Sequence, residues 1–203
     1  MTSPIIVALD LEHGLALDLA KSLDPNNCRL KVGSQLFTSV GPRIIEELSA
    51  LGFDIFLDLK FHDIPNTVAQ SVKAASNLGV WMLNVHTSGG SIMIKAAKEA
   101  TTGLIDPPLI IGVTMLTSLS EKDVNELGIK DISNQVVSLA SLAKKNSLDG
   151  IVCSANDVRR IKEILGKDFI TVTPGIRSSD SLKDDQSRVS TARNAIENGS
   201  DYL

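Results

Sequence analysis

Short apolar runs alternate with amphipathic stretches along the chain. Each run has the length of a strand and is bounded by polar or turn-forming residues. We predict strands at Ile5–Asp10, Cys28–Gly33, Asp54–Lys60, Trp81–Thr87, Leu109–Met115, Gly150–Ser154 and Phe169–Pro174. Because a helical pattern separates each run from the next, the order of elements predicts a parallel sheet with crossover helices.

Apolar residues recur between these runs at the spacing of one helix face. The clearest sets are Ile44, Ile45 and Leu48; Val68, Val72, Ala75 and Leu78; and Val136, Leu139, Ala140 and Ala143. A further helical pattern covers Arg193–Asn198, close to the end of the sequence.

Several of the predicted strands end in a polar residue, namely Asp10, Lys60 and His86. A strand that is apolar and then polar at its carboxyl end is typical of a barrel mouth, where active sites collect. An open doubly wound sheet is the structural alternative, but it usually has a glycine-rich turn after its first strand. Here Leu11-Glu12-His13-Gly14 follows instead. We therefore predict a single (β/α)8 TIM barrel domain over residues 1–203.

The eighth strand and helix of such a barrel are largely missing from the 203 residues. Gly199–Leu203 has the pattern of the start of an eighth strand. A barrel that stopped there would leave its first and seventh strands without their shared neighbour, with strand edges unpaired. We therefore expect the chain to be C-terminally truncated and the natural protein to continue.

Composition narrows the classes of partner. The net charge of -4 gives no general attraction for nucleic acid or an anionic membrane surface. We find neither a run of the ~18 apolar residues that span a membrane nor the start of a signal peptide. Cys28 and Cys153 each lie in an apolar run and are expected to be reduced, buried thiols of a cytoplasmic protein.

The densest cluster of charge is the segment Asp58-Leu59-Lys60-Phe61-His62-Asp63. Alternation along a strand places Asp58 and Lys60 on one face and Leu57 and Leu59 on the other. Asp58 and Lys60 then point into the barrel near its mouth. A buried ion-pair network that only braces the mouth would give the same pattern, so this segment alone does not establish catalysis.

A second acid and a second base strengthen the catalytic interpretation. Asp10 ends the first strand, and Lys31 lies on the inward face of the second. With Asp58 and Lys60 they would form a neutral, rigid array, which suits stabilisation of a developing carbanion and delivery of a proton by a lysine. Taken alone, Lys31 is equally well interpreted as a strand-end lysine that extends to solvent. We see no convincing metal-binding cluster.

The segment DLKFHDIPNT (58–67) is similar to the signature of the orotidine 5′-monophosphate decarboxylases. The resemblance extends along the chain, with its strongest likeness to the bacterial branch of that family. It is carried by VALD (7–10), RLKVG (29–33), NVHTSGG (84–90), VTMLTS (113–118), TPGIR (173–177) and DDQSRV (184–189).

This resemblance implies decarboxylation of orotidine 5′-monophosphate to UMP, the last step of de novo pyrimidine nucleotide synthesis, with no cofactor and no metal. It implies that carbon dioxide is lost directly and that Lys60 protonates C6 of the pyrimidine. Asp58 would lie beside the substrate carboxylate. Asp10 and Lys31 would bind the ribosyl hydroxyls, and Lys31 would also belong to the charge array.

Other residues would complete the site. In this family Asp63, Ile64 and Thr67 enter the neighbouring subunit's site, so the resemblance implies a homodimer with shared active sites. Thr117 would lie near the pyrimidine. Arg177 and Gln186 would belong to a loop that closes over the ligand, with Gln186 bridging phosphate and pyrimidine. The family's phosphate-binding Ile-Gly-Arg would follow Leu203 and is absent.

Two other functions stay open at this point. A magnesium-dependent enzyme like 3-keto-gulonate 6-phosphate decarboxylase shares the Asp-x-Lys-x-x-Asp core but has an acid where this chain has Lys31. A cation at that position opposes metal binding. The non-enzymatic alternative is a silent barrel that binds phosphorylated metabolites.

Overall fold

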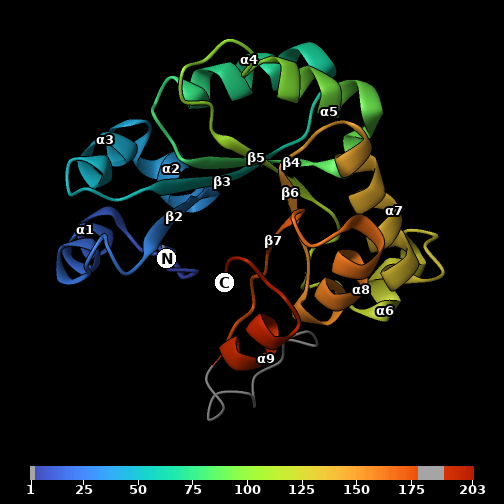
Figure 1. Cartoon of the computed structure of the whole chain (residues 1–203). Coiled ribbons are helices and arrows are strands. Elements are labelled where there is room, and N and C mark those ends of the chain that lie inside the picture. Colours follow the sequence, from blue (N-terminus) through green and yellow to red (C-terminus); the bar gives the residue numbers. More distant parts are fainter. Residues whose placement is uncertain (1–2, 178–189) are drawn as a thin grey trace.

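The computed structural model describes residues 3–177 and 190–203. Within them, seven strands form one parallel sheet in the order of the chain, from β1 to β7. Figure 1 shows this sheet strongly curled, with the helices on its outer side. Every predicted strand overlaps an observed one. The strands are β1 Ile6–Ala8, β2 Arg29–Gly33, β3 Ile55–Phe61, β4 Met82–His86, β5 Leu109–Val113, β6 Gly150–Val152 and β7 Ile170–Val172.

The helices lie between the strands along the chain. They are α1 His13–Ser22, α2 Ser34–Val40, α3 Arg43–Ser49, α4 Pro65–Ser76, η1 Thr87–Gly89 (a short 3-10 helix), α5 Gly90–Glu99, α6 Glu121–Glu126, α7 Ile132–Lys145, α8 Ala155–Leu165 and α9 Ala192–Glu197. None of the helices within the described ranges is long and apolar enough to cross a membrane.

Local sequence explains where the main helices begin. Pro65 occupies the first turn of α4, where its missing N–H costs nothing and its fixed φ suits a helix. Asp131 caps α7 by accepting a hydrogen bond from the backbone N–H of Asn134 at 2.9 Å. These starts place the apolar face of each helix against the sheet, and the predicted apolar residues of α7 are buried.

The strands pack on both faces, as the alternation of their side chains requires. Their outward side chains join the helices in one large core, which includes Leu30, Leu57 and Leu83. Their inward side chains form a smaller apolar cluster inside the curled sheet. That cluster contains Phe56, Met82, Ile111 and Val172. Two members of this cluster, Phe56 and Val172, also line the pocket at the carboxyl ends of the strands, next to its polar groups.

The amino ends of the strands are closed by an aromatic cluster around Arg29. The guanidinium carbon lies 4.2 Å from the centre of the Trp81 ring and 5.4 Å from that of Tyr202. Arg29 also donates hydrogen bonds to Asp54 and to the carbonyl of Ser3. Cation–π stacking and these bonds satisfy a guanidinium that is almost fully buried. Arg29 therefore belongs to the base of the sheet and not to the charged cluster at its mouth.

The last described residues lie between β7 and β1. Tyr202 forms a parallel bridge with Val172. Leu203 accepts a backbone hydrogen bond from Ile6 and donates one to the carbonyl of Pro4, both at 2.9 Å. The expectation that the first and seventh strands would lack a shared neighbour is therefore wrong at the amino end of β1 and the carboxyl end of β7, because backbone groups there find partners in the tail. Figure 1 shows the tail between the two ends of the sheet.

Candidate active site

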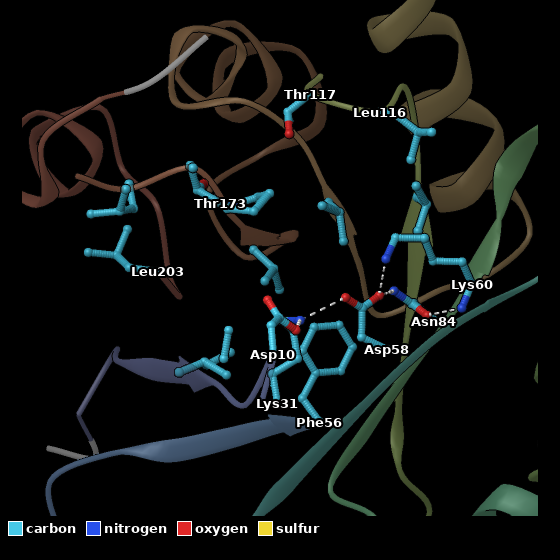
Figure 2. Close-up of a pocket in the computed structure, with 18 of the residues that line it drawn as sticks. Asp10, Lys31, Phe56, Asp58, Lys60, Asn84, Leu116, Thr117, Thr173 and Leu203 are labelled. Atoms are coloured by element: carbon cyan, nitrogen blue, oxygen red, sulfur yellow. Dashed lines mark hydrogen bonds and ion pairs between the residues drawn. The ribbon is translucent and has the colours of Figure 1, made fainter. Parts of the chain in front are cut away.

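A cavity of about 440 Å³ opens at the carboxyl ends of the strands. Its polar wall comes from the first four strands and the residues that follow them, and it contains Asp10, Lys31, Asp58, Lys60 and Asn84. Figure 2 shows these side chains gathered on one side of the pocket, with Thr117 on the opposite side. Sites of parallel α/β barrels lie at this end, so the pocket is the candidate active site.

Four charged groups form a continuous chain of ion pairs across this wall. Lys31 Nζ lies 3.3 Å from Asp10 Oδ1 and 3.4 Å from Asp58 Oδ2. Lys60 Nζ lies 2.7 Å from Asp58 Oδ1. The sequence predicted this meeting of neighbouring strands, and the structure brings all four residues together. Two acids balance two bases, which lowers the cost of removing the group from water.

Asp58 is the central residue of these ion pairs, and its side chain is the most deeply buried of the four. Burial by itself raises the pKa of the Asp58 carboxyl. The hydrogen bond and charge of Lys60, the hydrogen bond of Asn84 and the charge of Lys31 outweigh burial, so the pKa falls below its ordinary value. Asp58 is therefore an ionised carboxylate at neutral pH.

Gly33 makes room for the array on the second strand. A Cβ at this position would lie 3.3 Å from Asp10 Oδ1 and 3.5 Å from Lys31 Nζ. A larger side chain would press on the pair that joins the first two strands. An added methyl group would therefore require the Asp10 carboxylate to shift by a few tenths of an ångström.

Asn84 is the member of the wall that the charge pattern did not predict. It is buried on β4, accepts a hydrogen bond from the backbone N–H of Lys60 and donates one to Asp58 Oδ1, both at 2.7 Å. The available signal was a polar residue inside an otherwise apolar strand, because such a residue needs polar partners inside the protein. Lys60 itself has a φ of 52°, in the left-handed region that side chains rarely adopt.

Two histidines lie beside the array. The rings of His62 and His86 have their centres 5.3 Å apart. Burial first, then electrostatic interaction with His62 and Lys60, lowers the pKa of His86, and the charge of Asp58 opposes this only in part. His86 therefore adds no positive charge beside Lys60 at neutral pH.

The other predicted site residues divide into two groups. Thr117 and Arg177 line the cavity, and the Arg177 side chain donates a hydrogen bond to the carbonyl of Ile176. Gln186 lies outside the described residues. Asp63, Ile64 and Thr67 are exposed at the start of α4 and do not line this cavity. Asp63 accepts a hydrogen bond from the N–H of Ile64, whose side chain is 67% exposed.

The described residues contain no group of three or more His, Cys, Asp and Glu side chains arranged to hold a metal ion. Between the two acids of the pocket lies the ammonium of Lys31. A divalent cation at that place would meet a positive charge instead of a further oxygen ligand.

Residues 3–203 match the sequence profile of the "Orotidine 5′-phosphate decarboxylase / HUMPS family". The chain is 54% identical over 204 residues to orotidine 5′-phosphate decarboxylase of Chromobacterium violaceum, covering 100% of this chain and 83% of that protein. Identity to the enzyme of the same name from Saccharophagus degradans is 53% over 201 residues, covering 98% and 84%. The crystal structure of the Lactobacillus acidophilus orotidine 5′-phosphate decarboxylase superposes with a TM-score of 0.85 at 40% identity, covering 98% of this chain and 88% of that one.

Proposed function

Because the chain belongs to the orotidine 5′-phosphate decarboxylase / HUMPS family, we propose that its charged pocket removes carbon dioxide directly and that Lys60 protonates the product carbanion. The overall activity is decarboxylation of orotidine 5′-phosphate to UMP in pyrimidine synthesis, as in relatives that share more than half of its residues. The observation that carries the mechanism is the ammonium of Lys60, held 2.7 Å from a buried carboxylate at the pocket wall.

The proposed reaction has two steps. The bond between C6 and the carboxylate breaks, carbon dioxide leaves, and the electron pair remains on C6, where the ring conjugates it poorly. The ammonium of Lys60 stabilises that pair as it develops and then gives it a proton, which yields UMP. The positive charge is already in place and Asp58 holds it there, so little reorganisation is needed during the reaction.

The remaining roles are carried over from the family resemblance. Asp10 and Lys31 bind the ribosyl hydroxyls in this proposal, which the place of their ion pair on the polar wall supports. Thr117 is proposed to contact the pyrimidine, and its place across the pocket from them in Figure 2 supports this. Arg177 and Gln186 are proposed to contact the ligand, Gln186 from outside the described residues. Contacts far from C6 can supply binding energy for the reaction.

We further propose a homodimer in which Asp63, Ile64 and Thr67 complete the partner's pocket. Their exposure at the start of α4 and their distance from the cavity lining of their own chain support this. We also propose that the sheet is part of a (β/α)8 barrel. The bridge between Val172 and Tyr202, at the place of an eighth strand, supports the closed form.

Catalysis is proposed to need no metal or cofactor, because Lys31 occupies the space between the two acids that would hold a cation. The magnesium-dependent alternative requires an acid at that position. A cytoplasmic location is proposed from the reduced, buried Cys28 and Cys153.

The test follows loss of orotidine 5′-phosphate by ultraviolet absorbance. We expect activity in the wild type and its loss in Lys60→Ala by about 10³-fold or more, because both charge stabilisation and proton delivery disappear. Lys145→Ala, an exposed lysine on α7, is the matched control and should keep full activity. Chelation should change nothing. Activity abolished by chelation and restored by Mg²⁺ would favour the sugar-phosphate alternative, and an inactive wild type would favour the silent barrel.

A further inference from the structure

We propose that Asn84 is a positioning residue for the decarboxylation, because one side-chain amide holds both the backbone of Lys60 and the carboxylate of Asp58. Lys60 then presents its ammonium to the pocket from a fixed place. This inference rests on the proposed roles of Lys60 and Asp58, which it extends by one residue.

The backbone around Lys60 departs from a regular strand. Leu57 pairs with Leu83 and Phe61 pairs with Val85, so three residues of β3 lie opposite the single residue Asn84. Such bulges re-aim side chains and are frequent beside active sites. The bulge includes the left-handed φ of 52° at Lys60. A conformation of this kind persists only where the surroundings hold it.

Asn84 supplies that restraint. Its Oδ1 accepts the N–H of Lys60 at 2.7 Å, so this N–H has a partner although Lys60 lies in the unpaired part of the β3–β4 register. Its Nδ2 donates to Asp58 Oδ1 at 2.7 Å, the same oxygen that receives the ammonium of Lys60 at 2.7 Å. Figure 2 shows the resulting ring of three residues at one side of the pocket.

The chemistry of an amide suits this position. Asparagine carries an acceptor and a donor on one planar group and has no charge. A leucine would offer neither bond, and an ionised aspartate would offer only acceptors and would face Asp58 with a like charge. The neutral amide therefore satisfies both partners and leaves the balance of two acids and two bases intact.

The consequence concerns the direction of Lys60. Its charge stabilises the carbanion only if the ammonium lies close to C6, and a misplacement of about 1 Å costs on the order of 10²-fold in rate. Without Asn84 the bulge loses its restraint and the Lys60 backbone can relax. The residues proposed to bind the ribose, Asp10 and Lys31, are not hydrogen-bonded to Asn84, so binding should suffer much less than turnover.

The experiment compares Asn84→Ala and Asn84→Asp with the wild type. In Asn84→Ala we expect kcat to fall by about 10²-fold, with KM and UMP affinity changed by no more than a few-fold. In Asn84→Asp the new carboxyl shares a proton with Asp58. While protonated it reproduces the pattern of one acceptor and one donor, so its kcat should be nearest to the wild-type value at low pH. As pH rises and the shared proton is lost, its kcat relative to wild type should fall.

Thr114→Val is the matched control. Thr114 is buried just after β5, and its hydroxyl donates a hydrogen bond to the carbonyl of Val152 at 2.8 Å. The variant removes a buried hydrogen bond between neighbouring strands without contact to the four charges, and should keep wild-type kcat. A fall as large as that of Asn84→Ala would mean that any buried hydrogen bond has this effect, and the inference would be overturned.

Lys60→Ala in the same assay separates the two proposals. If it is inactive while both Asn84 variants turn over like the wild type, the positioning role is wrong and the proposed function stands. If Lys60→Ala stays active, the proposed role of Lys60 fails whatever the Asn84 variants do. Should Asn84→Ala not fold, the pH dependence of Asn84→Asp decides. If the ratio of its kcat to the wild-type kcat does not change with pH, the inference is wrong.

Discussion

Single charges in the pocket are stabilised by their neighbours, and Asp58 shows this most clearly. Its carboxylate is buried yet ionised, because Lys60, Asn84 and Lys31 together offset the cost of burial. A carboxyl whose pKa is lowered by folding stabilises the native state above its unfolded pKa of about 3.9. That contribution is lost as pH falls through the lower, native value.

The first prediction follows from this linkage. The free energy of unfolding should be measured by chemical denaturation between pH 6 and about pH 3 for the wild type and Asp58→Asn. We expect the difference in unfolding free energy between the two proteins to be constant near pH 6. As pH falls below about 3.9, the wild type should lose stability relative to Asp58→Asn. The variant has no carboxyl to titrate at this position. A difference that does not change with pH would contradict the assigned cause.

At the residue scale the sequence predicted which charged side chains meet, but not the backbone conformation of β3 that carries two of them. Asp10, Lys31, Asp58 and Lys60 were expected together, because parallel strands bring their carboxyl ends to one edge. The left-handed Lys60 was not predicted, because strict alternation assumes a regular strand and the bulge breaks it. Alternation still gave the correct face, since the bulge returns Lys60 to the side of Asp58.

At the scale of elements, close contact between β6 and β7 depends on a missing side chain. Gly150 pairs with Ile170 across the two strands. A Cβ at Gly150 would lie 2.3 Å from the carbonyl oxygen of Ile170, which is backbone and cannot turn away. The two strands would have to separate to accept it.

We therefore predict that Gly150→Ala destabilises the fold by about 1–3 kcal/mol, the usual cost of overpacking. Gly14→Ala is the control. Gly14 is in α1, and a Cβ there would meet no atom within 4 Å. That change should be neutral or stabilise by about 0.5–1 kcal/mol, because alanine favours a helix. Thermal unfolding of the three proteins measures both effects, and equal melting temperatures would refute the steric argument.

Strand positions were predicted well because each apolar run is separated from the next by a helix with a clear apolar face. The limits of elements were less certain. The strand predicted to run to Asp10 ends at Ala8, because beyond it the chain turns to present Asp10 at the pocket. The short 3-10 helix η1 has no periodic signal that a sequence could reveal.

For the whole molecule, the proposed dimer with shared pockets can be tested by mixing two inactive variants. Asp63 should act in the partner's pocket, whereas Lys60 acts in its own. We predict that mixing inactive Lys60→Ala and Asp63→Ala subunits restores activity, because one of the two sites in each heterodimer carries neither defect. With random exchange at equal amounts, the recovered activity should be about a quarter of the wild-type value, since half of the dimers have one intact site.

The matched control mixes Lys60→Ala with Lys31→Ala. Both residues serve the pocket of their own chain, so every site keeps one defect and no activity should return. Absence of recovery in the first mixture, after subunit exchange is verified, would count against crossing of the segment around Asp63. Recovery in the control mixture would show that the lysines are shared between subunits.

The base of the sheet has a spectroscopic consequence. Trp81 is the single tryptophan and Tyr202 the single tyrosine of the chain, and their rings meet edge to face with centres 5.1 Å apart. Intrinsic fluorescence therefore comes from one point, where the tail meets the amino ends of the strands. Far-ultraviolet circular dichroism instead averages over all the helices. Denaturation followed by both signals would thus compare the loss of structure around Trp81 and Tyr202 with the unfolding of the helices, without any added dye.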